Sequence, residues 1–411
     1  MAPALLLACT FVGLALFARP RPLPSPRESA QPLAPLPPAA SASVPPLVAI
    51  APPAGAGVSA ELGQMHGGPK RQHRASALGP QKPVLRWKTA VSGPVAAQIT
   101  TNTTGTALYV TTLAGELLSL GPDGVIRWRK NLGGRVYSAP TVSNDGTLFV
   151  GSDRGKLVAF RENGDEAWTF DASDEVDTAP LLRPGGGVVF TAGKALFALR
   201  PNGTAAFRAR LRKKSFASVA EAAPDRYVVA AQDQRVRLFD DKGTELWSVA
   251  AGGDVDGGPV VADSGEIFVG TDGGEVLSLA GDGAIRWRAK VGGFVRGALS
   301  LARNGDVLVG TYGPKPRMLR LAGADGHVVG EFDIQGTGAK EFGIHGGPLE
   351  DAAGNLFFGT QDDHVYAIGP EGLRWKFATG GDVDAPLTLL PDGTLLVGSY
   401  DGFVYALHDP F

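Results

Sequence analysis

Cysteine is almost absent from this chain, which has one, Cys9, among 411 residues. A body without cysteine forms no disulfide, no thiolate zinc site and no cysteine nucleophile. An excess of one charge sign is lacking too, because 39 Lys and Arg stand against 41 Asp and Glu, for a net charge of −2. Such a balance provides no broad cationic surface, so we expect no nucleic acid as a partner.

Catalytic motifs are also missing. The sequence has no GxSxG elbow, no HExxH, no P-loop and no Cys/His cluster. We therefore expect no catalytic residue, no cofactor site and no metal site. Glycine and proline, in contrast, are abundant, with 57 and 31 residues, and no segment keeps a sustained helical period. A turn-rich composition of this kind favours an all-β fold.

The N-terminus begins with an unbroken apolar run over residues 2–18, followed by Arg19 and Arg21. Its length suits the apolar region of a signal peptide or a membrane anchor, and we expect residues 1–18 to serve export or membrane association. As a membrane span, its charge pattern would instead leave the following chain in the cytoplasm. The sequence "LLAC" ending at Cys9 resembles a lipoprotein processing site, so lipidation is an alternative to simple cleavage.

Residues 19–83 have a different composition, crowded with Pro, Ala and Ser. Such a segment buries too little apolar surface to offset the entropy of ordering, so we expect a disordered, extended linker. A linker between an apolar N-terminus and a folded body fits a protein that is exported and held near a membrane.

The rest of the chain, residues 84–411, is a repeat. Aromatic residues recur at intervals of 39 to 45 positions and mark eight units: Trp87, Trp128, Trp168, Phe207, Trp247, Trp287, Phe332 and Trp375. Eight units of about forty residues are typical of a repeat architecture. We expect these aromatic residues to dock each unit onto its neighbour.

Each unit contains four short apolar segments bounded by Asp, Asn or Gly, as in "VYSAPTVS", "NDGTLFVGS", "DRGKLVAFR" and "ENGDEAWTF". Four short strands per unit, repeated eight times, predict an eight-bladed β-propeller of four-stranded blades. The last unit stops after its third strand. The segment "VLRWKTA" (84–90) should therefore complete the last blade and close the ring.

The repeat resembles the PQQ-like, or quinoprotein-type, propeller family. The resemblance rests on a turn glycine before the aromatic in seven units, as in "GVIRW", "GTELW" and "GLRW", and on third strands such as "KLVAF" and "FVYAL". Among proteins of this type, the chain is similar in blade number and export to the propeller lipoproteins of outer-membrane protein assembly. The resemblance also includes quinoprotein dehydrogenases, which bind PQQ with calcium over the channel.

One face of the expected ring gathers chemically active side chains. Aligned positions just before the first strands define a channel mouth, and its candidate binding residues are Asp177, Asp256, Arg296, His345 and Asp384. Turns between second and third strands add Asp153, Asp272, Asp362 and Asp401 to this face. These carboxylates would attract a cation or a basic partner segment. The alternative is that they only cap turns, which is ordinary chemistry for Asp.

Units six and seven depart from the repeat. The turn "YGPKPRM" (312–318) and the extended loop "DIQGTGAKEFGIH" (333–345) lie on the same face. Because function in propellers tends to reside in such insertions, we expect partner binding at Lys315, Arg317, Lys340 and Glu341.

The sequence thus predicts a non-catalytic, monomeric scaffold that binds other envelope proteins, with outer-membrane protein assembly as the pathway that the resemblance suggests. We expect it in the periplasm, at the outer membrane or at the cell surface. The alternative is a PQQ- and calcium-dependent quinoprotein dehydrogenase. It lacks support because the body has no cysteine, the mouth offers mainly carboxylates, and every unit is short.

Overall fold

The computed structural model describes residues 60–335, 339 and 342–410. The chain divides into two units, 1–54 and 55–411, and the account below concerns the second. The apolar segment 1–18 with Cys9, the first part of the expected linker (19–59), and Lys340 and Glu341 lie outside the described residues. Within the described part of the chain, no helix has the length and apolar character needed to cross a membrane.

Residues 84–410 form eight four-stranded antiparallel blades, which confirms the predicted eight-bladed β-propeller. The first four blades consist of β2 (Thr100–Thr101), β3 (Leu108–Thr111), β4 (Glu116–Leu120) and β5 (Ile126–Asn131); β6 (Thr141–Val142), β7 (Leu148–Ser152), β8 (Lys156–Phe160) and β9 (Glu166–Asp171); β10 (Leu181–Leu182), β11 (Val188–Ala192), β12 (Ala195–Leu199) and β13 (Ala205–Arg210); and β14 (Ala220–Ala223), β15 (Arg226–Ala231), β16 (Arg235–Phe239) and β17 (Glu245–Ala250).

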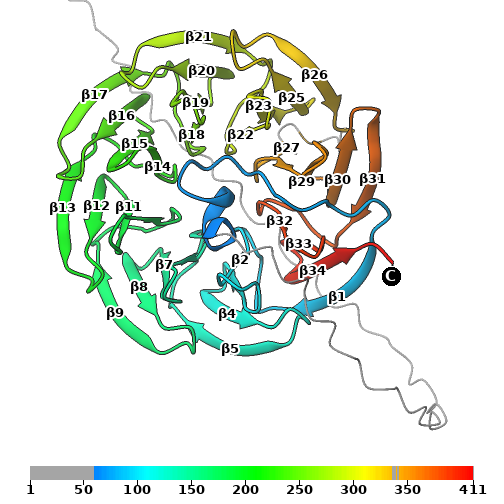
Figure 1. The fold of residues 1–411 in the computed structure, drawn as a ribbon, viewed down its shortest axis with the longest axis horizontal. Helices are drawn as coiled ribbons and strands as arrows, with labels where there is room; N and C mark the ends of the chain where they lie inside the picture. Colours follow the sequence, from blue (N-terminus) through cyan, green and yellow to red (C-terminus); the bar gives the residue numbers. More distant parts are fainter. Residues whose placement is uncertain (1–59, 336–338, 340–341, 411) are drawn as a thin grey trace, which may run out of the picture. The chain divides into compact units, whose positions relative to one another are not determined.

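The other four blades follow the same order around the ring (Figure 1). They consist of β18 (Val260–Val261), β19 (Ile267–Gly270), β20 (Glu275–Leu279) and β21 (Ile285–Lys290); β22 (Ser300–Leu301), β23 (Val307–Gly310), β25 (Arg317–Leu321) and β26 (Val328–Asp333); β28 (Leu349–Glu350), β29 (Leu356–Thr360), β30 (His364–Gly369) and β31 (Gly372–Ala378); and β32 (Thr388–Leu389), β33 (Leu395–Gly398), β34 (Phe403–His408) and β1 (Val84–Ala90). A two-stranded sheet of β24 (Tyr312–Gly313) and β27 (Phe342–Gly343) joins blades six and seven.

Ring closure follows the predicted route. Strand β1 pairs antiparallel with β34, with Trp87 opposite Ala406 and Ala90 opposite Phe403. The eighth blade therefore takes its outer strand from the start of the folded body and its other three strands from the C-terminus (Figure 1). Because the two extremities share one sheet, the described ring has no open end that would expose an apolar face.

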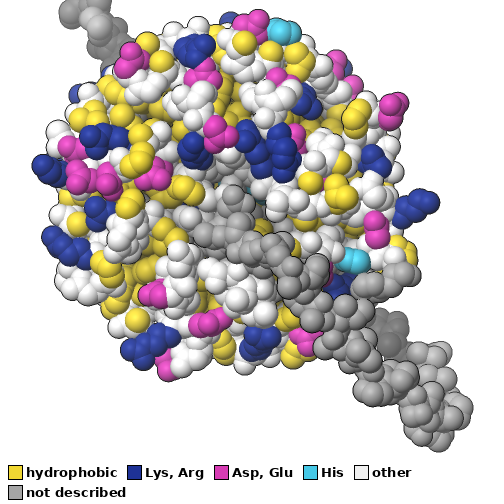
Figure 2. All heavy atoms as spheres, viewed as in Figure 1, with side chains coloured by type: hydrophobic (Ala, Val, Ile, Leu, Met, Phe, Trp, Pro, Cys, Tyr) yellow, Lys and Arg dark blue, Asp and Glu magenta, His cyan; other side chains and the backbone are white. Residues whose placement is uncertain are grey.

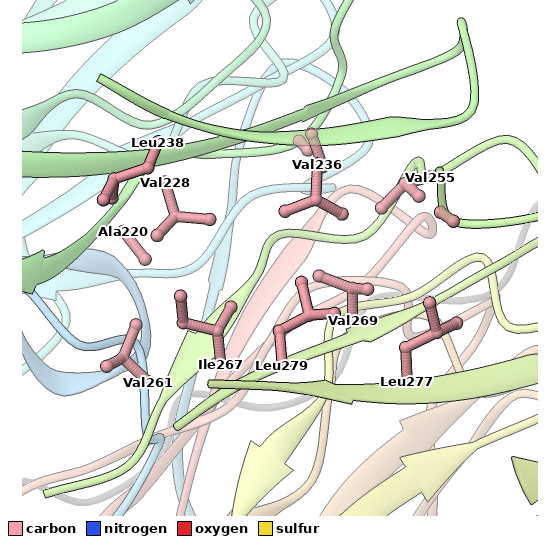
Figure 3. Packing of buried hydrophobic residues seen from close by; sticks show 13 residues of the cluster. Ala220, Val228, Val236, Leu238, Val255, Val261, Ile267, Val269, Leu277 and Leu279 are labelled. Atoms are coloured by element: carbon pink, nitrogen blue, oxygen red, sulfur yellow. The ribbon is translucent and has the colours of Figure 1, made fainter. Parts of the chain in front are cut away.

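Apolar side chains fill the space between neighbouring blades. Figure 3 shows the interface of blades four and five, where Val228, Val236 and Leu238 face Ile267 and Leu279. All of these side chains are buried. Consecutive residues of the second and third strands are buried, as in β19 and β20, because successive side chains point to opposite faces of the blade and each face packs against a neighbouring blade.

Seven outer strands carry an aromatic residue that docks onto the next blade. The six indole N–H groups each donate to a backbone carbonyl of the neighbouring blade or of the segment before β1, at 2.8 to 3.0 Å. The donor–acceptor pairs are Trp87–Pro122, Trp128–Glu162, Trp168–Pro201, Trp247–Gly281, Trp287–Gly323 and Trp375–Pro80. Phe207 takes the same position on the turn glycine Gly243.

Blade six differs, and the prediction for Phe332 is corrected. The register of β26 places Gly330 opposite Arg320, at the docking position, whereas Phe332 lies two residues further, opposite Met318. Phe332 instead packs against Tyr366, as Phe377 packs against Tyr405 in the next blade. The docking position itself holds a glycine, since Gly330 follows the turn glycine Gly326 by four positions, as Trp128 follows Gly124, whereas Phe332 follows it by six.

The described part of the expected linker is also ordered, which corrects the prediction for residues 60–83. This axial segment contains two short 3-10 helices, η1 (Ala60–Gly63) and η2 (Met65–Gly67), and crosses the centre of the ring in Figure 1. Its backbone pairs with one blade after another. The carbonyls of Pro69, Lys70, Gln72 and His73 accept N–H bonds from first-strand residues of blades four to seven: Glu221, Val261, Leu301 and Glu350.

The contacts of Arg71 explain why the composition of residues 60–83 wrongly predicted disorder. Its side chain is buried at the axis and donates to the carbonyl oxygens of Met65, Ala179, Pro180 and Val219. Buried backbone carbonyls of the inner strands need donors, and one guanidinium supplies several of them. Polar contacts to the propeller, rather than apolar burial within the segment, hold these residues in place.

Candidate functional site

The channel mouth is built by one repeated contact. A buried aliphatic residue just before the mouth residue packs onto a glycine at or next to the end of the second strand of the preceding blade. A Cβ added to that glycine would lie 2.2 to 2.5 Å from the aliphatic side chain in five blade pairs. The pairs are Gly151–Val176, Gly270–Val295, Gly310–Ile344, Gly359–Val383 and Gly398–Val95. Each contact fixes the next residue at the rim of the ring, among them Asp177, Arg296, His345 and Asp384.

The mouth residues are joined from blade to blade. A side chain in the turn between strands two and three of one blade contacts the mouth residue of the next blade. Gln232 donates to Asp256 at 3.1 Å, and Gln361 donates to Asp384 at 2.9 Å. The Arg296 Nε donates to Asp272 at 2.6 Å. The structure therefore brings the predicted mouth residues together on one face. Three of them, Asp256, Asp384 and Arg296, form a side-chain hydrogen bond with an adjacent blade.

His345 and Arg296 share an aromatic neighbour. Tyr312, which is buried, lies edge-on to His345 with ring centroids 6.1 Å apart, and the Arg296 guanidinium lies 5.9 Å from the centre of the same ring. His345 itself is exposed. Burial, and then the charge of Asp384, raise the pKa of the Tyr312 hydroxyl well above its usual range. Tyr312 thus remains a neutral hydrogen-bonding group at the rim.

Asp177 has the most unusual environment at the mouth. Burial, and then the carboxylates of Asp153 and Glu175, raise the pKa of Asp177 to about 7. Among the described residues, the Oδ1 atoms of Asp153 and Asp177 are both buried without a hydrogen-bond partner. Lys214 is a cation near this pair, but it bonds to Glu175 at 2.5 Å. Burial and the adjacent carboxylates therefore disfavour the ionised form of Asp177.

Asp256 shows the same effect in milder form. Burial is the main cause that raises its pKa, and the hydrogen bond from Gln232 opposes that rise. The nearby carboxylates of Asp272 and Asp254 act in the same direction as burial. The mouth is thus a rim of crowded carboxylates, and a positive group from a partner would relieve their mutual repulsion.

Two of the predicted acidic residues behave as turn caps. Asp362 accepts from Thr360 and, at 2.6 Å, from the Tyr366 hydroxyl. Asp401 accepts from the backbone N–H groups of Gly380 and Phe403. Their oxygens serve their own turns, so the turn-capping interpretation holds for these two and not for Asp153 and Asp272.

The floor of the mouth comes from residues that the sequence did not reveal. Met65 of the axial segment packs against Ala97, Ala139 and Ala179, which lie one or two positions after mouth positions. The axial segment bonds to the ends of the inner strands, whereas the mouth lies at their beginnings, so it approaches from the opposite face. Met65 therefore contacts the ring directly beneath the mouth positions. Figure 2 shows the opposite face, where basic and acidic side chains are interspersed around the rim.

Two histidines lie beneath this floor. The rings of His66 and His73 stack with centroids 4.2 Å apart and an interplanar angle of 2°. Both side chains are buried, and burial lowers the pKa of His73 to about 4 and that of His66 well below its usual range. The His73 Nε2 bonds to the Leu387 carbonyl at 2.9 Å. Neutral imidazoles stacked at the axis thus connect the axial segment to the ring.

The predicted partner residues of units six and seven have separate environments. Lys315 is exposed in the turn before β25. Arg317 pairs with Glu331 at 2.7 Å and donates to the Val291 carbonyl at 2.9 Å, so it ties three segments together. Lys340 and Glu341 lie outside the described residues. Among the described residues, no group of three or more His, Cys, Asp or Glu side chains could hold a metal ion.

Comparison with known proteins places this architecture in context. The model of the family described as outer membrane protein assembly factor BamB matches residues 71–146, 142–234 and 232–370. A curated relative, outer membrane protein assembly factor BamB from Burkholderia pseudomallei, is 31% identical over 119 residues. That match covers 28% of this chain and 29% of the relative, so it spans less than a third of the relative's length.

Solved structures show the same fold. BamB from Moraxella catarrhalis superimposes with a TM-score of 0.66 at 15% identity, over 79% of this chain and 99% of that one. A europium-containing methanol dehydrogenase superimposes with a TM-score of 0.70 at 13% identity, over 83% of this chain and 91% of that one. At such low identity these similarities establish the propeller and do not distinguish a scaffold from an enzyme.

Proposed function

The chain belongs to the family of outer membrane protein assembly factor BamB, and from this premise we propose that it is a non-catalytic scaffold that binds other envelope proteins during the assembly of outer-membrane proteins. We propose the channel mouth as its docking surface. The partner would present a basic segment to Asp177, Asp256 and Asp384, with His345 and Arg296 at the same rim.

The carboxyl pair Asp153–Asp177 is the observation that carries this assignment. Among the described residues each carboxyl has a buried Oδ1 without a hydrogen-bond partner, and burial and the neighbouring acids raise the pKa of Asp177 to about 7. An arrangement that disfavours ionisation at neutral pH lowers the stability of the free protein. Groups of this kind cluster where proteins bind or react, because a ligand can supply the missing counter-charge.

The proposal extends to compartment and assembly state. Residues 1–18, with Cys9, would direct export and provide cleavage or lipidation, so that the body lies in the periplasm, at the outer membrane or at the cell surface. The closed ring buries the apolar faces of its blades, so we propose that the propeller acts as a monomer. Intact-mass analysis of the mature protein from fractionated cells distinguishes cleavage from lipidation.

A PQQ-type cofactor, which the dehydrogenases of this fold imply, does not fit the mouth. That cofactor is a tricarboxylate and requires several converging cations. The mouth presents Asp177, Asp256 and Asp384 instead, and its Arg296 is bonded to Asp272. Met65 and the axial segment also occupy the axis below the mouth. We therefore assign no catalytic step to this chain.

The role in assembly is tested in the source organism. Deleting the gene should lower the amount of folded outer-membrane β-barrel proteins, and the wild-type chain should restore it. A double variant, Asp177→Asn with Asp256→Asn, should restore it poorly. Asp241→Asn, which removes an exposed charge from the turn before β17 on the opposite face, should restore it fully. Unchanged β-barrel levels after deletion would refute the proposal.

The enzyme alternative has its own test. The purified full chain is incubated with PQQ and calcium and assayed for oxidation of alcohols and sugars with an artificial electron acceptor. We expect no turnover above a protein-free blank. Turnover that follows the amount of reconstituted protein would replace the scaffold assignment with a quinoprotein dehydrogenase.

A further inference from the structure

Blade six lacks the aromatic side chain that docks each of the other blades onto its neighbour. In those outer strands the aromatic lies opposite the third-strand residue next to a bulge, as Trp128 lies opposite Ser119 and Trp375 opposite Ala367. The same register in β26 contains Gly330, opposite Arg320. The interface between blades six and seven therefore has no indole or phenyl ring at the docking position.

The turn that would receive this ring is open. Elsewhere the ring packs onto the turn glycine of the next blade, and a Cβ added to that glycine would lie within 3.0 Å of a ring atom. This holds for Gly124, Gly164, Gly203, Gly243, Gly283 and Gly326. The equivalent glycine of blade seven is Gly372, and a Cβ added there would meet no atom within 4 Å. The receiving surface is present and the docking group is missing.

A pocket of about 280 Å³ occupies this place. Gly330, Gly372 and Pro370 line it together with the apolar side chains of Leu356 and Ile368. Arg320 borders it with its stem, while its head group bonds to Asp306 at 2.7 Å. Pockets for drug-sized ligands or cofactors begin at about 300 Å³, so this one suits a single large side chain.

We propose that this pocket binds a tryptophan side chain of a partner protein. Six of the equivalent positions hold an indole whose N–H donates to a backbone carbonyl. Pro370 stands in the blade-seven turn where Pro122 stands in blade one, the turn that receives Trp87. An incoming indole would meet the same glycine surface and the same kind of acceptor. The inference does not depend on the proposed function, because the pocket lies between outer strands and not at the mouth.

The test uses N-acetyl-tryptophanamide as the probe and the full chain. Ligand-observed NMR should show saturable binding to the wild type, and Gly330→Trp, which supplies the indole internally, should weaken it at least tenfold. Ile285→Trp is the control. It adds a tryptophan to the outer strand of blade five, where Ile285 pairs with Leu279 as Val328 pairs with Leu321 in blade six, and so it leaves the pocket unfilled. This control should bind the probe as the wild type does.

A second probe keeps the test valid if Gly330→Trp does not fold. The 1-methyl derivative of the probe lacks the N–H donor and should bind the wild type roughly three- to tenfold more weakly, the effect of one lost hydrogen bond. The proposal is overturned if the wild type shows no saturable binding or if Gly330→Trp binds equally well. Equal binding of N-acetyl-phenylalaninamide would likewise overturn the assignment of an indole.

Discussion

The indole N–H of Trp375 donates to the carbonyl oxygen of Pro80 at 2.8 Å, although 295 positions separate the two residues. In the other blades the indole bonds to a turn that follows it by 33 to 36 positions. The eighth blade has no such turn, because its outer strand β1 comes from the start of the folded body. Pro80 supplies the missing carbonyl, so ring closure includes the axial segment as well as β1.

Trp375→Ala should therefore loosen the axial segment. We expect a loss of about 3 kcal/mol in the free energy of unfolding, because a large aromatic side chain and its hydrogen bond are removed. Hydrogen exchange should become faster in residues 76–90. Trp128→Ala is the matched control, since its partner Glu162 lies within the ring, and it should destabilise the protein without faster exchange in that segment. Equal effects of the two variants would contradict this mechanism of closure.

The buried histidines predict a loss of stability in acid. His73 has a folded pKa of about 4 because it is buried, and an ordinary unfolded pKa of about 6.5. Between these values the unfolded chain binds more protons, so the free energy of unfolding falls as the pH falls from 6.5 towards 4. From pH 7 to pH 5, His73 alone should account for about 2 kcal/mol.

Urea unfolding at the two pH values measures this effect. His73→Gln, which cannot be protonated, should lose less stability on acidification than the wild type does. His327→Gln, which changes an exposed histidine, should behave like the wild type. A wild type and a His73→Gln variant with identical pH dependence would show that His73 does not stay neutral in the folded protein.

Asp177 predicts the opposite pH dependence. Its pKa is raised from an unfolded value near 4 to about 7, so the folded state binds more protons between these values and stability falls as the pH rises. Asp177→Asn removes that loss and should raise the free energy of unfolding at pH 8 by about 4 kcal/mol, since one pKa unit corresponds to about 1.4 kcal/mol. The gain should vanish below pH 4. A destabilised Asp177→Asn at pH 8, with Asp241→Asn neutral, would contradict the crowded-carboxylate account.

The glycine contacts behind the mouth predict a steric effect. In Gly359→Ala the new Cβ would lie 2.2 Å from Val383, the residue that positions Asp384. We expect a loss of about 2 kcal/mol, because the core has no room for the methyl group. Gly281→Ala is the control, since its nearest neighbour would be 3.8 Å away, and it should cost less than about 0.5 kcal/mol. Equal thermal denaturation midpoints for the two variants would refute the packing argument.

The fold could be predicted from the sequence because each blade repeats the same interaction. Aromatic residues at a nearly constant interval indicate a contact that recurs from blade to blade. The last unit lacks a fourth strand, which indicates that residues 84–90 supply it and close the ring. The rule failed at Phe332 because spacing alone cannot detect a shift of register. Opposite Met318, Phe332 fills an apolar core position, and only strand pairing shows that Gly330 takes the docking position.

The site could be predicted from the sequence only in part. The sequence located Asp177, Asp256, Arg296, His345 and Asp384, because near-copies of one loop must lie at equivalent places. It could not show that the charge of Asp153 raises the pKa of Asp177, since that contact joins two blades. Residues 60–83 were missed for a related reason. Their contacts are polar bonds to distant carbonyls, and composition reports only apolar burial.

Site-specific photo-crosslinking in cells tests the docking surface at the mouth most directly. A photoreactive residue replaces Tyr137, which takes the mouth position of blade two as Asp177 does in blade three and is 39% exposed. At the control position it replaces Val125, which is 60% exposed in the turn before β5 on the opposite face. Mass spectrometry identifies the crosslinked proteins. We predict that outer-membrane assembly proteins crosslink to position 137, that Asp177→Asn reduces their yield, and that position 125 does not capture them. The same partners at both positions, or none at position 137, would contradict the account.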